Sequence, residues 1–190
     1  MKRTCRALLL TGAALLVWSP APASADGFIS PWVAANFGHG LDDGGRGSYG
    51  FNAGYMGNGI IGGEFDFGYS PRFFGDQAVF GSNNVLSAMG NVIVGIPVGG
   101  TTGQGARPFA TAGVGLIRSD VDGLFEGSNA SNDFGFNVGG GVMGYFSDHF
   151  GVKGEVRYFR TVNDNSTPNN FDLDLGGLHY WRAAVGLVIR

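Results

Sequence analysis

Histidine and serine side chains are the first candidates for chemistry in this sequence. His39, His149 and His179 lie far apart, and none has a Cys, a Glu or a second His at the spacing of a metal site. Ser147 lies close to His149, but no Gly-x-Ser-x-Gly elbow leads into a helix, so a nucleophile with its base has no signature here. The sequence therefore predicts no catalytic residue and no cofactor, and we expect that the protein is not an enzyme.

Acidic side chains form two further candidate sites. Asp120, Asp122 and Glu126 lie in one polar stretch, and Asp172 and Asp174 lie in another. Oxygen ligands at this density resemble those of calcium loops, but the full spacing of an EF-hand is missing. Solvated acidic loops and a divalent-cation site therefore both stay open.

A third set of charged residues alternates with apolar residues. In HFGVKGEVRYFR, residues 149–160, three charges occupy every second position, and bulky apolar or aromatic residues lie between them. A β-strand with this pattern has one charged face and one apolar face. The set consists of Glu64, Asp66, Lys153, Glu155, Arg157 and Arg182. Three acids balance three bases, so the pattern predicts a network of ion pairs.

Eight segments with a period of two could hold these charges, and no segment keeps a helical period. Each is about 9–14 residues long, whereas strands of globular sheets have about 5–6 residues and membrane strands about 9–11. Their length therefore favours strands that cross a membrane. The segments are 29–37, 48–56, 60–69, 85–96, 107–117, 133–146, 149–160 and 178–189.

The connectors between these segments alternate in length. Every second connector of an up-and-down barrel lies at the same end, and outer-membrane barrels have short periplasmic turns and long extracellular loops. Long connectors are expected at 38–47, 70–84, 118–132 and 161–177, short ones at 57–59 and 147–148, and one of intermediate kind at 97–106. The order of lengths thus predicts an eight-stranded antiparallel up-and-down transmembrane β-barrel.

The charged faces must point into this barrel. Lys153 or Arg157 against lipid would cost about 2–4 kcal/mol each at mid-depth, whereas the apolar faces suit lipid. Aromatic residues stand near both ends of the outward faces, as in the girdles of membrane barrels. A soluble lipocalin-like barrel, with its apolar face inside, is the alternative fold.

The first 25 residues read as a secretory signal. Lys2, Arg3 and Arg6 precede an apolar run and a small-residue site, so cleavage is expected between Ala25 and Asp26, with the barrel domain at 26–190. The chain has 12 Lys and Arg against 15 Asp and Glu. Losing three basic residues with the leader leaves a net charge of about −6, which argues against a nucleic-acid partner.

The chain resembles the small eight-stranded outer-membrane barrels of the OmpA transmembrane-domain and opacity-protein type. GVKGEVRYFRTV, residues 151–162, resembles their penultimate strand, while Arg190 stands where the family usually ends in an aromatic residue. The resemblance implies a place in the cell outer membrane, contact with its lipids and lipopolysaccharide, and insertion by the outer-membrane assembly machinery. It also implies host, phage or envelope ligands at the loops, where acidic residues could hold cations that bridge to lipopolysaccharide phosphates.

Three classes of function follow from this interpretation. The first is a structural or surface-interaction barrel that acts through its long extracellular loops and has a lumen plugged by the charge network. The second is a narrow porin-like channel or a carrier of a small ligand. The third, an outer-membrane enzyme, lacks a convergent Ser, His and Asp group. Four polar loops rich in Gly and Asn favour the first class, because such loops make adaptable contact surfaces.

Overall fold

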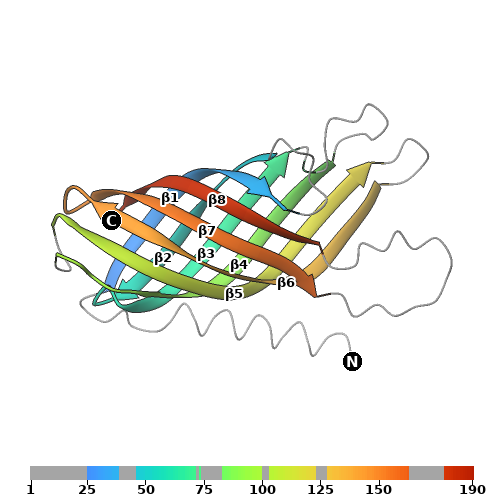
Figure 1. The fold of residues 1–190 in the computed structure, drawn as a ribbon. Coiled ribbons are helices and arrows are strands. Elements are labelled where there is room, and N and C mark those ends of the chain that lie inside the picture. The colour runs from blue at the N-terminus through green and yellow to red at the C-terminus, as the bar shows by residue number, and fades with distance from the viewer. Residues whose placement is uncertain are drawn as a thin grey trace, which may run out of the picture.

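The computed structural model is a closed β-barrel of eight antiparallel strands, which confirms the predicted fold (Figure 1). It describes residues 25–38, 46–71, 73, 83–99, 103–122, 128–162 and 178–190. The strands are β1 Ala25–Phe37, β2 Arg46–Gly57, β3 Ile61–Pro71, β4 Asn83–Gly95, β5 Gly105–Asp122, β6 Ser128–Tyr145, β7 Phe150–Val162 and β8 His179–Ile189. No helix long and apolar enough to cross a membrane occurs in these ranges.

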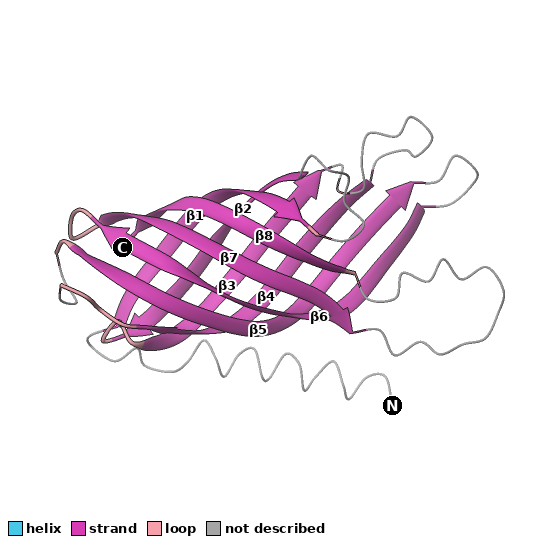
Figure 2. Ribbon diagram, viewed as in Figure 1, coloured by secondary structure: helices cyan, strands magenta, loops and turns pink. Residues whose placement is uncertain are grey.

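Each strand pairs with its neighbours in sequence, and β1 pairs with β8 to close the barrel. The turn between β2 and β3 is formed by Asn58 and Gly59, both at positive φ (49° and 69°), which is the backbone that a tight hairpin with right-handed twist requires. In the turn between β6 and β7, the Ser147 hydroxyl accepts a hydrogen bond of 3.0 Å from the Phe150 amide. These short turns lie at the same end of the barrel as the C-terminus (Figure 2).

One predicted connector is wrong. The segment 118–132 was expected to be a long loop, but β5 continues to Asp122 and β6 begins at Ser128. Within the segment 118–132, backbone pairing between the two strands continues from Arg118↔Asn132 to Asp122↔Ser128. The side chains of this segment are mostly polar, so its sequence has no alternation of apolar and polar residues that would predict a strand. The backbone hydrogen bonds of a hairpin do not depend on such alternation, and strand pairing therefore extends past the apolar band.

Alternation along the strands separates an inner face from an outer face. In β7 the odd-numbered residues from 151 to 161 are buried, and they include three charged side chains and Phe159. The even-numbered residues between them face outward. The outer face exposes apolar and aromatic side chains around the barrel, such as Val33, Phe65, Val114 and Leu187. This register is firmly fixed, because a slip by one residue would turn every inner side chain of the strand outward.

Candidate functional site in the barrel lumen

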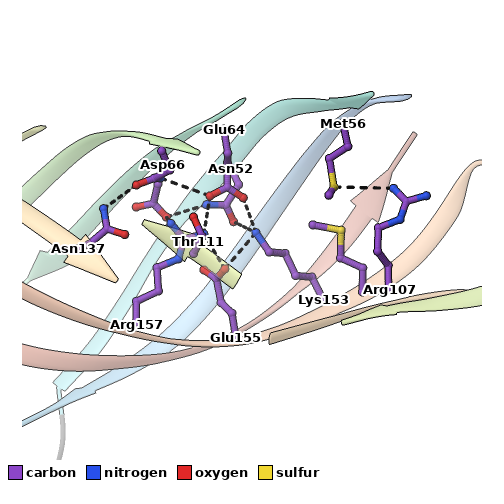
Figure 3. A network of polar contacts seen from close by, with 12 residues as sticks. Asn52, Met56, Glu64, Asp66, Arg107, Thr111, Asn137, Lys153, Glu155 and Arg157 are labelled. Carbon is purple, nitrogen blue, oxygen red and sulfur yellow. Dashed lines mark hydrogen bonds and ion pairs between the residues drawn. The ribbon is translucent and has the colours of Figure 1, made fainter. Parts of the chain in front are cut away.

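The six charged residues that the sequence predicts for the interior all lie there and come together. Figure 3 shows Glu64, Asp66, Lys153, Glu155 and Arg157 among them. Each is at most 5% exposed. Strand β3 supplies two of them, β7 supplies three at alternate positions, and β8 supplies one. We call Glu64, Asp66, Lys153, Glu155, Arg157 and Arg182 the ion-pair network.

Arg157 lies at the centre of the ion-pair network. Its Nη2 is 2.5 Å from Glu64 Oε1 and 2.7 Å from Glu155 Oε2, and its Nη1 is 3.6 Å from Asp66 Oδ2. The side chain is fully buried. One guanidinium thus contacts three carboxylates on two strands that face each other across the lumen, and its fork of donors suits such a site better than a lysine would.

The other two cations complete the neutralisation. Lys153 Nζ lies 2.6 Å from Glu64 Oε2 and 3.0 Å from Glu155 Oε2. Arg182 Nη2 lies 2.5 Å from Asp66 Oδ2 and 3.7 Å from Glu155 Oε1. The contact of Arg182 with Glu155, on the adjacent strand β7, is therefore longer than its contact with Asp66 across the lumen. Each carboxylate has at least two cations within 4 Å, as buried charges require if they are to stay ionised.

Three asparagines extend the ion-pair network with neutral hydrogen bonds. Asn52 Nδ2 donates to Asp66 Oδ2 at 2.6 Å, and Asn52 Oδ1 accepts from Lys153 Nζ at 3.1 Å. Asn91 Nδ2 donates to Glu64 Oε1 at 3.4 Å, and Asn91 Oδ1 accepts from Asn137 Nδ2 at 2.6 Å. The carboxylates thus have hydrogen-bond donors as well as charges around them, which lowers the cost of their burial.

Aromatic rings pack against the long cationic side chains, and glycines leave room for them. The Arg182 guanidinium carbon lies 4.2 Å from the Trp32 ring centroid and 4.7 Å from that of Phe159. Gly139 and Gly141 pair in register with Arg157 and Glu155. A side chain at either glycine would meet these residues, since a Cβ at Gly139 would lie 2.7 Å from Arg157 Cγ.

Apolar side chains fill the barrel on both sides of the ion-pair network. The turn-end cluster, beside the short turns, consists of Phe28, Met56, Ile93, Phe109, Met143, Tyr145 and Val188. The loop-end cluster, beside the long connectors, consists of Phe73, Val85, Met89, Ile117, Phe159 and Tyr180. The lumen therefore has an apolar layer at each end and a charged layer between them. The sequence predicted the polar inner faces but not these two apolar layers.

Arg107 is the interior charge that sequence reasoning missed. It is 2% exposed, its Nη1 lies 3.8 Å from Met56 Sδ, and its guanidinium carbon lies 5.3 Å from the Tyr145 ring centroid. Figure 3 places Arg107 beside Met56, away from the ion-pair network. The available signal was the alternation of the strand: Arg107 stands two residues before Phe109 and four before Thr111, so it shares their buried face. Among the described strand residues that are buried, the charged side chains are thus four cations and three carboxylates.

The other candidate residues do not form a reactive site in the described part of the chain. The Ser147 hydroxyl is engaged in the turn, and His149 lies exposed beside it. His179 lies near the Tyr158 ring at the other end of the barrel. Asp120 and Asp122 lie on β5 rather than in a loop, while His39, Glu126, Asp172 and Asp174 lie outside the described residues. Within those residues no group of three or more His, Asp or Glu side chains is placed to hold a metal ion.

Comparison with known proteins gives the same architecture. The family described as outer membrane protein beta-barrel domain matches residues 11–177. Neisserial surface protein A is similar in structure, with a TM-score of 0.64 at 16% identity over 87% of this chain and 97% of that one. The N-terminal β-barrel domain of Pseudomonas aeruginosa OprF gives a TM-score of 0.52 at 17% identity over 86% and 98% of the two chains.

A third similar structure is Ail, the attachment invasion locus protein of Yersinia pestis, in complex with the heparin analogue sucrose octasulfate. Its TM-score is 0.57 at 12% identity, over 87% of this chain and 97% of Ail. At such identities the likeness concerns the fold alone. A search of curated protein sequences gave no significant match.

Proposed function

Because the chain belongs to the outer membrane protein β-barrel family, we propose that it is an integral outer-membrane barrel with a closed lumen. Its role is structural or surface-interacting and is carried out by the long connectors at the loop end. The barrel holds these connectors in place, and lipids and lipopolysaccharide surround it. The assembly machinery of the outer membrane inserts it after removal of residues 1–25.

The filled lumen is the observation that carries this proposal. An eight-stranded barrel is just wide enough for its own side chains. Here Arg157, Met56, Met89 and Met143 are all fully buried within it, at 0% exposed. A solute that crossed the barrel would have to displace both apolar clusters and separate ion pairs of 2.5–2.7 Å. Such a displacement is costly, which favours a barrel that does not conduct.

Conductance tests the closed lumen directly. The mature barrel, refolded and inserted into a planar lipid bilayer, should give no steady conductance above that of the lipid alone. Insertion is checked in the same preparation by the slower or faster gel mobility of the unheated barrel compared with the boiled one. A large, stable conductance from inserted barrel would contradict the proposal.

A narrow channel or a small-ligand carrier is the second candidate, and the charged middle layer favours it. Water and ions prefer such a layer to an apolar one, so a barrel whose apolar clusters moved aside would offer a polar path. In that case Arg157→Met should change the ratio of cation to anion permeability, because it removes a positive charge from the path. If the wild type conducts and Arg157→Met has the same ratio of cation to anion permeability, the conducting path does not run through the lumen.

Surface exposure of the connectors is a test of the interaction role. Protease added to intact cells should cut the long connectors at 38–47, 70–84 and 161–177 and the segment 123–127 between β5 and β6. The turns at 57–59 and 147–148 should stay intact, because they face the periplasm in this orientation. Cleavage at the turns alone would show that the barrel has the opposite orientation.

Ail, a protein of the same fold, has been crystallised with a heparin analogue, so a barrel of this kind can present a ligand-binding surface.

A further inference from the structure

The charged side chains that the structure describes on the outer face of the barrel lie at one end. Among strand residues whose side chains the structure describes, the outward positions hold two charged residues, Arg118 and Arg160, and both are exposed. Both lie near the loop end of their strands, and both are cations. All other charged side chains described on the strands face the lumen. Among strand residues whose side chains the structure describes, the outward positions therefore hold cations near the loop end and no acidic side chain.

Aromatic side chains fix the level of Arg160 relative to the membrane. Phe37, Trp181 and Tyr158 pair in register across β1, β8 and β7, and all three face outward. The Tyr158 and Trp181 ring centroids are 5.2 Å apart. Such a row lies at the boundary between hydrocarbon and headgroups. Arg160 follows Tyr158 by two residues on the same face, which at about 3.3 Å per residue and ~40° tilt places it ~5 Å further out.

The neighbours of Arg160 complete a site at the level of the headgroups. In the next row of the barrel, Arg160 pairs with His179 on β8 and with Phe136 on β6. A guanidinium and an imidazole thus stand side by side above the aromatic row. Arg118 has different neighbours, since it pairs with Leu86 and Asn132. The arrangement around Arg160 offers a planar fork of donors, which matches the geometry of a phosphate.

We propose that Arg160 and His179, above the Tyr158–Trp181 pair, bind a phosphate of an outer-leaflet glycolipid of the lipid A type. The acyl chains of that lipid lie against the aromatic row and the apolar residues below it. The position of Arg160, at the loop end and on the lipid side, selects a lipid phosphate of the outer leaflet over a phosphate in the lumen. This inference rests on the proposed orientation in the outer membrane.

Lipid retention measured by native mass spectrometry tests the site. The barrel is titrated in zwitterionic micelles with bisphosphorylated lipid A, and the fraction that carries one lipid is recorded. A basic residue near an anionic surface contributes about 1 kcal/mol, so Arg160→Gln should weaken retention about five-fold. Arg160→Lys should retain an intermediate amount of lipid, because the charge remains but the planar fork of donors is lost. Arg118→Gln, the same change on the same face, is the matched control and should leave retention unchanged.

Three outcomes would overturn the site. Equal retention by wild type and Arg160→Gln shows that Arg160 does not bind the phosphate. An equal loss for Arg118→Gln and Arg160→Gln shows general electrostatic attraction. Equal retention of phosphatidylglycerol and lipid A by the wild type shows that the lipid class is wrong. A wild-type barrel that fails to insert into phosphatidylcholine vesicles would instead contradict the proposed function, so the two failures are distinguishable.

Discussion

Replacing Arg157 by Met should destabilise the barrel strongly, although Met fills much of the same volume. The Arg157 guanidinium contacts Glu64 at 2.5 Å, Glu155 at 2.7 Å and Asp66 at 3.6 Å, and it is fully buried. Its loss leaves three buried carboxylates with only Lys153 and Arg182 beside them. Removing one partner from a buried ion pair typically costs about 3–5 kcal/mol, most of which is the cost of leaving the other charge uncompensated.

Urea unfolding in phosphatidylcholine vesicles measures this loss. The fluorescence of Trp32, inside the barrel, and Trp181, on the lipid side, reports on the transition. With a slope of about 2 kcal/mol per molar urea, a loss of ~4 kcal/mol lowers the midpoint by ~2 M. Arg160→Met, the same substitution three residues along the strand at an exposed outward position, is the control and should cost less than about 1 kcal/mol.

A second variant separates charge from packing. In Glu64→Gln/Arg157→Met one anion and one cation are removed together, so the ion-pair network keeps two acids and two bases. Replacing both members of a buried pair is often close to neutral, and the double variant should recover at least half of the lost stability. If the double variant is as unstable as the sum of the two single variants, charge balance in the lumen is not what Arg157 provides, and the reasoning fails.

Three further predictions concern glycines and processing. Gly139→Ala should cost about 1–3 kcal/mol because its Cβ would lie 2.7 Å from Arg157 Cγ, whereas Gly154→Ala, whose Cβ meets nothing within 4 Å, should leave the urea midpoint unchanged or slightly higher. Gly59→Ala should cost about 1–2 kcal/mol in the same assay, since Gly59 has φ +69° and a Cβ there would also lie 2.7 Å from Arg107; an unchanged midpoint would show that the turn tolerates a side chain. N-terminal sequencing of the protein from the outer-membrane fraction should begin at Asp26, and recovery of residues 1–25 would refute the cleavage.

The face of each side chain could be predicted from the sequence, but its depth and its partner could not. The alternation around Lys153 and Glu155 decides which side of a strand is charged, because charges on the lipid side are costly. It does not say how far along the barrel two strands are offset, since their register depends on the complete set of backbone pairs. Adjacent strands alone would place Arg182 beside Glu155 on β7, but its shorter contact is with Asp66 on β3.

Two other features carry no clear periodic signal. The inner faces near the barrel ends hold residues such as Met56, Ile93 and Val188, so apolar residues occupy both faces of the same strand and the alternation disappears. The hairpin of β5 and β6 continues through polar residues, where neither face is apolar. Arg107 was missed for a related reason, because it stands at the start of its segment and has no acid at an alternate position of β5.

The large sequence separation of the interior ion pairs has a consequence for the lifetime of the folded barrel. Lys153 and Glu64 are 89 residues apart, and Arg182 and Asp66 are 116 apart. Such contacts require most of the chain to be in place, so we expect them to form after the rate-limiting step of folding. Interactions absent from the transition state slow unfolding and leave the folding rate almost unchanged. The charges inside the barrel would then set how long one molecule persists in its membrane, independently of how quickly it was assembled.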